Sequence, residues 1–446
     1  MSHWVSPRYA ETGRLLAIRS FMMVLVCSGA QATELDVTAY SDTKYTSNAG
    51  LVTTATKSDV IEKIGLNVLF LEQRKRFDAQ ANFNLAQEYY LKNSFSQQTD
   101  LTTGFGLFNF DIIEDFLDWR TSFTRTQSLS NTTLANTPDN RGERNVLKTG
   151  PSINYRINSV STFDLGANFT QVENSGDTAI DSKRVGANAG YNYQYNSITT
   201  MSLGGSYDEI IEIDQKNTAS NDEVRNSNLN VGFAREFSQG LFNLTVGVTQ
   251  VSSDSEETVT GNFFRLNFER QQFFLHDVSI NYSESISDSS IGFDELTLIE
   301  DSGEVEQVNI EESSLLDIIT LKQSSIVFTR SLDAFQYSVS SFWNDKDYEI
   351  QLNDEQSLGF FLGLKYRIHE AWAAGFSYRH DRQKFFDLPE LGQNVTHTYK
   401  VDSDYQWTQT FSSNAYVAYE RRQNDKSAIR EYEEFSVGVT LSVKLY

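Results

Sequence analysis

Residues that could act as catalysts or metal ligands are sparse in this chain. After residue 32 the histidines are His276, His369, His380 and His397, and neither an H-E-x-x-H nor a G-x-S-x-G motif occurs. Those motifs support hydrolysis because they fix zinc ligands or a serine nucleophile at a set spacing. A triad gathered from separate segments, for example with His380 and Asp381, is singled out by no pattern. We therefore expect no enzyme and no cofactor, since P-loop and dinucleotide motifs are also missing.

The most distinctive polar segment spans residues 284–314. It carries ten acidic residues between Glu284 and Glu312 and no basic one. Three functions fit such a segment: a constriction folded into a pore, a vestibule that attracts cations, or a divalent-cation site. The simpler interpretation is an external loop kept soluble by its charge, and no D-x-D-x-D-G calcium-loop spacing occurs. Leu298 and Val308 flank a turn at 301–303 and predict a projecting hairpin. The central acidic residues are Asp294, Glu295, Glu300, Asp301, Glu304 and Glu306.

Other charged residues alternate with apolar ones along the chain. In a β-strand successive side chains point to opposite faces, so these charges lie on a polar face behind an apolar one. Basic and acidic members occur in similar numbers, and Asn, Gln, Ser and Thr surround them. The polar face is therefore expected to be wet and nearly neutral. Its main candidates are Arg120, Arg184, Arg265, Glu269, Lys365, Arg367, Arg379, Asp402 and Asp404.

The elements that position these charges are alternating segments that recur from Leu35 to Leu445. The longest, from Leu358 to Ile368, keeps one phase throughout. Such runs match the roughly 9–11 residues that cross a bilayer as a tilted strand. Strands of a soluble β-sandwich are shorter, about 5–6 residues. A secreted sandwich or β-solenoid is the alternative to a membrane barrel.

Connections between the runs alternate between short and long. Nine short and ten long connections join about 20 strands, with 18–20 as the expected range. Outer-membrane barrels show this asymmetry, with short periplasmic turns and long extracellular loops. We predict an all-β, transmembrane, antiparallel up-and-down β-barrel. Its polar face, with the charges named above, would line the lumen. The alternation starts at Leu35, so we expect no folded plug domain ahead of the barrel.

Residues 1–32 are expected to be an export signal. Arg14 and Arg19 precede the apolar run 21–26, and small residues close the segment at Ala30 and Ala32. This order is that of a secretory signal peptide. The apolar run is far shorter than the roughly 18–20 residues of a membrane-spanning helix. Cleavage after Ala32 would leave residues 33–446 as a single barrel domain.

Composition supports these predictions. A net charge of −23 argues against nucleic acid as a partner, because phosphate binding needs clustered Lys and Arg. The four prolines are few, as a continuous hydrogen-bonded ladder requires, and Pro151, which falls within an expected strand, predicts a bulge. Trp119, Trp372 and Trp407 fall near short connections and Trp343 near a long one. They are the expected aromatic girdles at the two membrane interfaces.

A family resemblance rests on about ten hairpins, on the signal ending Ala30-Gln31-Ala32, and on strands rich in Tyr and Asn such as 186–195. The chain resembles the porin-like outer-membrane β-barrels associated with exopolysaccharide and PEP-CTERM gene clusters. The resemblance implies a Gram-negative outer-membrane location and passage of an extracellular polysaccharide. A separate periplasmic export partner would deliver the polymer. A barrel also requires outer-membrane lipid and the barrel insertion machinery as partners.

Three functions follow as hypotheses. The first is an outer-membrane channel whose role is polysaccharide export. The second is a general diffusion porin for small solutes. The third is a non-conducting barrel with a structural or adhesive role at the cell surface.

Overall fold

The protein is an antiparallel β-barrel. The computed structural model describes residues 34–95, 99–100, 102–129, 134–175, 180–215, 224–253, 258–273, 276–288, 298–299, 305–306, 317–349, 354–388, 390–427 and 430–446. Alternating apolar and polar residues give these strands one face for lipid and one for water. The twenty long strands are β1 (Glu34–Thr46), β2 (Asp59–Arg74), β3 (Phe77–Tyr90), β5 (Thr103–Ile113), β6 (Leu117–Leu129), β7 (Arg141–Asn158), β8 (Ser161–Asn174), β9 (Ile180–Asn196), β10 (Thr199–Gln215), β11 (Val224–Phe237), β12 (Gly240–Ser253), β13 (Val259–Phe273), β14 (His276–Asp288), β17 (Ile318–Leu332), β18 (Phe335–Tyr348), β19 (Glu355–His369), β20 (Trp372–Phe385), β21 (Gln393–Gln406), β22 (Phe411–Asn424) and β23 (Tyr432–Lys444).

Three shorter strands and one turn of helix complete the secondary structure of the described residues. β4 (Thr99–Asp100) pairs with the end of β3, and β15 (Leu298–Ile299) pairs with β16 (Val305–Glu306). The 3₁₀ helix η1 (Pro138–Asn140) precedes β7. Among the described residues, no helix combines the length and apolarity that crossing a membrane requires.

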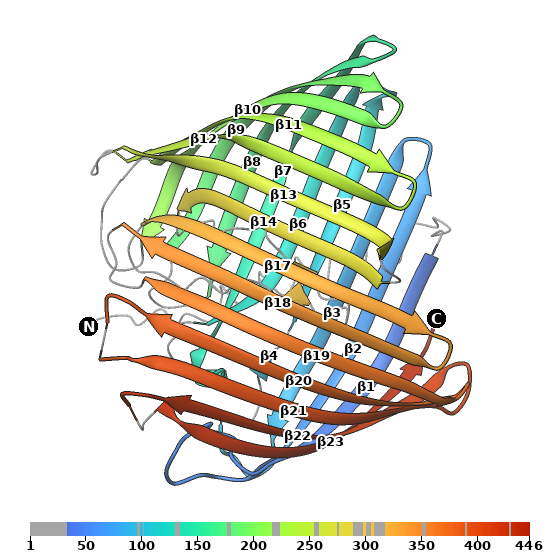
Figure 1. Cartoon of the computed structure of the whole chain (residues 1–446), viewed down its shortest axis with the longest axis vertical. Coiled ribbons are helices and arrows are strands. Elements are labelled where there is room, and N and C mark those ends of the chain that lie inside the picture. Colours follow the sequence, from blue (N-terminus) through green and yellow to red (C-terminus); the bar gives the residue numbers. More distant parts are fainter. Residues whose placement is uncertain are drawn as a thin grey trace, which may run out of the picture.

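Each long strand pairs with its sequence neighbour, and the ring closes where β1 pairs with β23 (Figure 1). Their register runs from Thr38↔Lys444 to Thr46↔Ser436. Closure leaves the long-strand ladder without an open edge, which is the condition for placing a sheet in hydrocarbon. The predicted all-β antiparallel barrel of about 20 strands is therefore confirmed.

The two ends of the barrel differ, as the alternation of connections predicts. One end carries nine connections of two to four residues, such as 75–76, 114–116 and 407–410. The other end carries ten connections of five residues or more, the longest of which is 289–317. Both β1 and β23 have their outer termini at the short-turn end.

Pro151 does not produce the predicted bulge. The register of β7 with β8 runs from Thr149↔Phe169 to Ser152↔Gly166 in one phase, with no pair recorded at Gly150 and Pro151. Proline lacks the N–H that a ladder bond needs, so the ladder is interrupted without a shift in register. On the other side, Pro151 stays opposite Trp119 of β6.

Candidate transport pathway

One contact identifies the inner face of the barrel. The guanidinium of Arg184 on β9 binds the carboxylate of Asp288 at the end of β14, with Nη1 to Oδ2 at 2.7 Å. Strands β10 to β13 lie between these two strands in the sheet. A side-chain contact that spans four intervening strands runs through the inside of a closed ring. The face that carries Arg184 is therefore the lumen face, and the opposite face meets lipid.

The strand registers carry this assignment around the ring. For example, Ser122 lies opposite Lys148, which lies opposite Thr170, which lies opposite Arg184. Followed in both directions, the registers place all nine lumen candidates on the inner face: Arg120, Arg184, Arg265, Glu269, Lys365, Arg367, Arg379, Asp402 and Asp404.

Most of these charges have a partner on the same wall. Lys365 Nζ lies 2.8 Å from Asp404 Oδ2, reaching from β19 to β21. Arg379 Nε lies 2.6 Å from Asp381 Oδ2. Arg120 Nη2 lies 3.4 Å from Asp118 Oδ2. Arg367 Nη2 donates to the Asp333 carbonyl in the neighbouring short turn. Such internal pairing lowers the net charge that a passing solute meets.

Two ion pairs on the same wall are absent from the candidates that the sequence suggested, and the second of them is buried. Lys44 Nζ of β1 lies 2.8 Å from Glu434 Oε1 of β23, and Lys346 of β18 contacts Glu355 of β19. In the alternating run, Lys44 falls on the opposite face from Val37 and Ala39. Extending each alternating run to its full length would have found such residues.

The Arg184–Asp288 contact also clamps the end of β14. Arg184 is 2% exposed and Asp288 1% exposed, and Asp208 of β10 lies 3.4 Å from the same guanidinium. The β13–β14 pairing stops at Phe264↔Glu284, while β14 continues beside β17 to Asp288. The end of the paired strands β14 and β17 that adjoins the long connection therefore separates from β13 and lies against the inner wall.

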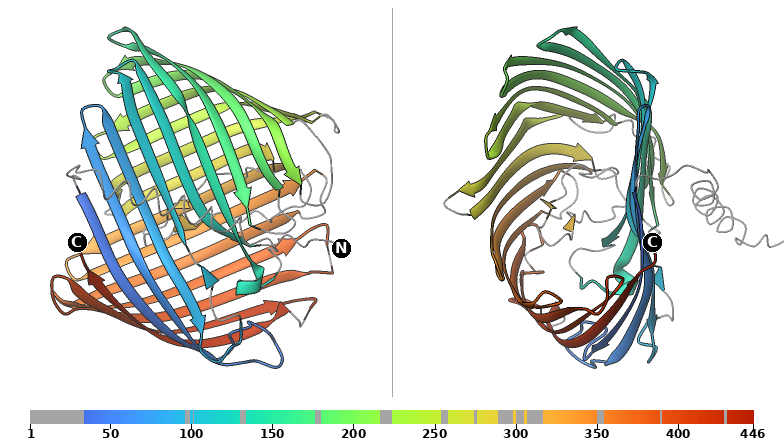
Figure 2. Two further views of the ribbon diagram at one scale, coloured as in Figure 1. Left: turned by 180° about the vertical axis from the view of Figure 1, so that it is seen from behind. Right: turned by 90° about the vertical axis from the view of Figure 1, so that its right-hand side faces the viewer.

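Apolar packing supports this arrangement. Ile286 of β14 and Ile318 of β17 pack with Ile210, Val224 and Val251 of β10 to β12 in one buried cluster. A Cβ built on Gly261 of β13 would overlap the Ile286 side chain, so that glycine makes room for the hairpin end. Figure 2 shows the end of β14 turning into the ring.

The acidic segment begins where this clamped hairpin ends. Asp294, Glu295, Glu300, Asp301 and Glu304 lie outside the described residues. Glu306 belongs to β16, opposite Leu298 of β15. The predicted hairpin thus exists, with shorter strands than the apolar residues suggested. In both views of Figure 2 its two strands lie within the outline of the barrel instead of projecting from it.

A cavity of about 500 Å³ lies on the inner wall around the β1–β23 closure. Tyr40 faces Gly65 across β1 and β2, and Tyr416 faces Gly438 across β22 and β23. A Cβ on either glycine would overlap the tyrosine ring, so both rings lie along the wall over a residue without a side chain. The Tyr40 hydroxyl donates to Asn84 Oδ1 at 2.7 Å.

Charges around this cavity are balanced and largely engaged. Asp42 accepts from the Thr440 hydroxyl at 2.6 Å, and Glu434 pairs with Lys44. Lys63 Nζ lies 5.9 Å from the Tyr40 ring centroid, and Lys400 Nζ lies 5.0 Å from that of Tyr416. The remaining lining is mostly amide and hydroxyl: Asn67, Asn84, Thr398, Asn414, Ser436, Thr440 and Ser442. Such a surface replaces the hydrogen bonds that a hydroxylated solute makes with water.

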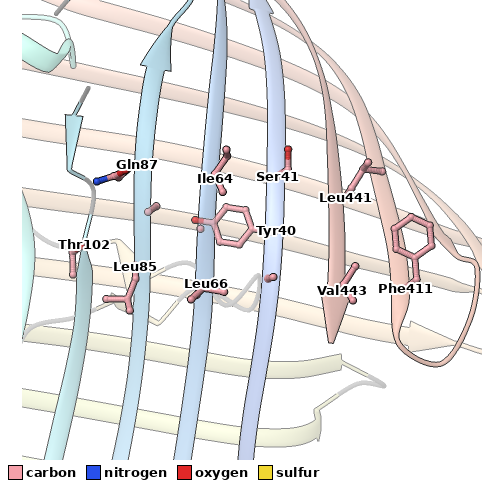
Figure 3. A pocket seen from close by; sticks show the side chains of 13 residues that line it. Tyr40, Ser41, Ile64, Leu66, Leu85, Gln87, Thr102, Phe411, Leu441 and Val443 are labelled. Atoms are coloured by element: carbon pink, nitrogen blue, oxygen red, sulfur yellow. The ribbon is translucent and has the colours of Figure 1, made fainter. Parts of the chain in front are cut away.

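The outer face of the same wall is apolar. A shallow hollow of about 640 Å³ runs along β1, where Ala39 and Ser41 are small (Figure 3). Ile64 and Leu66 border it on one side and Leu441 and Val443 on the other.

The four tryptophans of the described residues lie on the outer face, and three of them are at the short-turn end. There, each indole N–H donates at 2.9 Å to a hydroxyl: Trp119 to Thr149, Trp372 to Ser403 and Trp407 to Ser413. Trp343, opposite Leu358 on β19, lies toward the long-loop end. An indole with one apolar body and one satisfied N–H suits a membrane interface.

The described residues contain no group of three or more His, Cys, Asp or Glu that could hold a metal ion. His380 and Asp381 are consecutive on β20 and so project from opposite faces of the sheet. They therefore do not form a catalytic pair.

No protein-family model matches this chain, and no curated protein matches it either. Among solved structures, the siderophore receptor PirA from Acinetobacter baumannii is similar with a TM-score of 0.50 and 7% identity, over 93% of this chain and 81% of that one. A mutant of the ferric enterobactin receptor PfeA from Pseudomonas aeruginosa, in complex with enterobactin, gives a TM-score of 0.50 and 9% identity, over 93% of this chain and 82% of that one. The FrpB iron transporter from Neisseria meningitidis, in its apoprotein form, gives 0.48 and 11%, over 92% and 82%. These neighbours are outer-membrane β-barrels, and at such identities the likeness to the two receptors shows the fold alone.

Proposed function

We propose that this protein is an outer-membrane channel for uncharged, hydroxyl-rich solutes, and that its main role is export of an extracellular polysaccharide. The observation that carries the proposal is the inner wall. Its charges are mostly paired with one another, and amide, hydroxyl and tyrosine side chains fill the space between them. A wall of this kind offers hydrogen bonds without strong selection for ionic charge.

The two tyrosines over glycine favour sugars within that solute class. Their rings give flat apolar surface along the wall, next to Asn84 and Asn414. A pyranose ring has both apolar C–H faces and hydroxyl edges, so it matches alternating aromatic and amide surface. The resemblance to barrels of exopolysaccharide gene clusters supports the same class. A periplasmic export partner would then deliver the polymer.

Planar-bilayer recording of the purified barrel tests the channel. The expected result is a steady ion current with little preference between K⁺ and Cl⁻, because the wall is nearly neutral. Neutral glucan oligomers on one side should reduce that current in a concentration-dependent way. A barrel that carries no current at any voltage would refute the channel and leave the structural or adhesive alternative.

A deletion strain tests the export role separately. Loss of surface or secreted polysaccharide, restored by the intact gene, is the expected outcome. Normal polysaccharide together with slower uptake of small solutes would instead identify a general diffusion porin. The two results are distinguishable because the first concerns a polymer leaving the cell and the second concerns solutes entering it.

A further inference from the structure

Basic side chains gather on one part of the outer face of this acidic chain. His380, Arg382 and Lys384 of β20, His397 of β21 and Arg421 of β22 form what we call the basic patch. All five alternate with inner-face residues near the long-loop ends of their strands. The registers join them directly, with His380 opposite His397 and His397 opposite Arg421.

A row of tyrosines lies next to the basic patch, on the side nearer the short-turn end. Tyr378, Tyr399 and Tyr419 face one another across β20, β21 and β22, with ring centroids 4.9 Å and 6.5 Å apart. The Tyr378 hydroxyl lies 3.0 Å from His397 Nδ1, so the row and the patch are in contact. Tyrosine, like tryptophan, is enriched at the level of lipid headgroups.

The next row toward the short-turn end is apolar. Phe376, Val401 and Val417 face one another on the same outer side, and Val401 is 57% exposed. The outer surface therefore changes in three steps from apolar to tyrosine to basic. This order is the one that a membrane leaflet imposes, from acyl chains through the interface to the headgroups.

Among the described residues, one carboxylate pairs with the basic patch. Arg421 has a partner in Glu433 at 3.2 Å. Arg382 and Lys384 make no ion pair with any described residue, and the Lys384 ammonium instead lies 4.5 Å from the Phe386 ring centroid. An arrangement of this kind is stable when an anion from outside the chain completes it.

We propose that the basic patch binds the phosphate groups of an anionic outer-leaflet lipid whose acyl chains lie against the apolar row. Arginine donates two parallel hydrogen bonds to phosphate, and lysine adds a compact positive charge. A soluble acidic partner would leave the tyrosine and apolar rows uncovered, whereas one phosphorylated lipid covers all three. The inference rests on the proposed outer-membrane location, and does not require the barrel to conduct.

Lipid binding to the purified full-length barrel in neutral detergent provides the test. The probes are diphosphoryl lipid A, the same lipid with its phosphates removed, and inorganic phosphate. Wild-type protein is expected to prefer the diphosphoryl form, with a preference that weakens as salt is raised. The variant Arg382→Gln with Lys384→Gln should weaken that binding by about tenfold or more, as the loss of charge-assisted bonds predicts.

A matched control separates the patch from any surface arginine. Arg225 of β11 also lies on the outer face at the long-loop end, where Glu209 is 3.5 Å away. Arg225→Gln should bind diphosphoryl lipid A as wild type does. Heat-modifiable gel mobility checks that each variant is folded, and His397→Gln replaces the double variant if that one does not fold.

Two results would overturn the inference. Equal binding of the phosphorylated and dephosphorylated lipids would show that the basic patch does not recognise phosphate. Loss of inorganic phosphate binding in the double variant, with unchanged lipid binding, would identify a free-anion site instead. Conductance recorded on the same preparation keeps the two proposals apart: binding without current refutes the channel alone, and current without binding refutes the lipid site alone.

Discussion

Replacing Arg184 by Gln should release the end of β14 from the inner wall of the barrel. The change leaves the carboxylates of Asp288 and Asp208 close together without a cation, at a place where Asp288 is 1% exposed. Removing one partner of a buried ion pair costs about 3–5 kcal/mol, because an uncompensated charge stays buried. The ladder around the ring does not depend on this pair, so the loss should be local to the clamped hairpin end.

The magnitude translates directly into an accessibility measurement. A cost of about 3–5 kcal/mol shifts a local opening equilibrium by roughly two to three and a half powers of ten. The only cysteine of the chain is Cys27, within the expected signal, so a thiol introduced by Ile286→Cys reports this site alone. In the Arg184→Gln background a water-soluble thiol reagent should modify position 286 about 100- to 3,000-fold faster than in the parent.

Two further variants make this experiment decisive. Lys365→Gln removes the Lys365–Asp404 pair, whose side chains are 53% and 40% exposed, and should cost only about 0–1 kcal/mol. Its labelling rate at position 286 should match the parent. Arg184→Met combined with Asp288→Leu replaces the pair by apolar groups and should restore protection. An unchanged labelling rate in Arg184→Gln would refute the clamp.

Three other outcomes follow from the geometry. Gly438→Val should lower the heat-denaturation midpoint of the barrel, at a cost of about 1–3 kcal/mol, because a Cβ there overlaps the ring that covers it; Gly190→Ala, whose nearest neighbouring atom would be 3.8 Å away, should not. Val401→Arg on the lipid face should cost about 2–4 kcal/mol in refolding titrations into lipid vesicles, and normal refolding would contradict the face assignment. Desolvation raises the pKa of Asp354, in the 349–354 connection, to about 6, and the nearby Asp387 carboxylate adds to this rise. The protonated Asp354 side chain therefore stabilises the fold fully below the usual pKa of an aspartate, and this stabilisation is lost as the pH rises through 6. Amide exchange of that connection across pH 4–7 measures this loss, and the pH dependence should vanish in Asp354→Asn.

The strand pattern of the sequence predicts the barrel because period-two alternation is a local property. Runs such as 358–368 appear in β19 with the expected faces, and the turns fall within a few residues of their expected places. Inner and outer faces follow from phase alone. For that reason residues as separate as Arg120 and Asp404 could be assigned to one face before any pairing was known.

The sequence does not predict what happens inside the ring. The contact between Arg184 and Asp288 joins positions 104 residues apart, and nothing local marks them as partners. Phase also fails for Ile286, which alternates like a lipid-facing residue and yet packs in the buried inner cluster. The side chain of Ile286 points to the inner cluster because β14 separates from β13 there, and that separation depends on tertiary packing. The pairing of Lys365 with Asp404 across Gly375 depends in the same way on the register of three strands.

The seam between β1 and β23 has a consequence for how the chain becomes a barrel. Lys444 binds Asp36 across a separation of 408 residues, and the amide of Val37 donates to the carbonyl of Tyr446, the last residue. Closing a loop of that length costs roughly 5 kcal/mol in chain entropy. The ring closes only when β23 pairs with β1, so one edge of β1 must remain unpaired until then. An edge of this kind pairs readily with other chains. The protein should therefore depend on a protected environment for β1 during synthesis and insertion, and truncation of the last strand should aggregate the chain instead of yielding a smaller barrel.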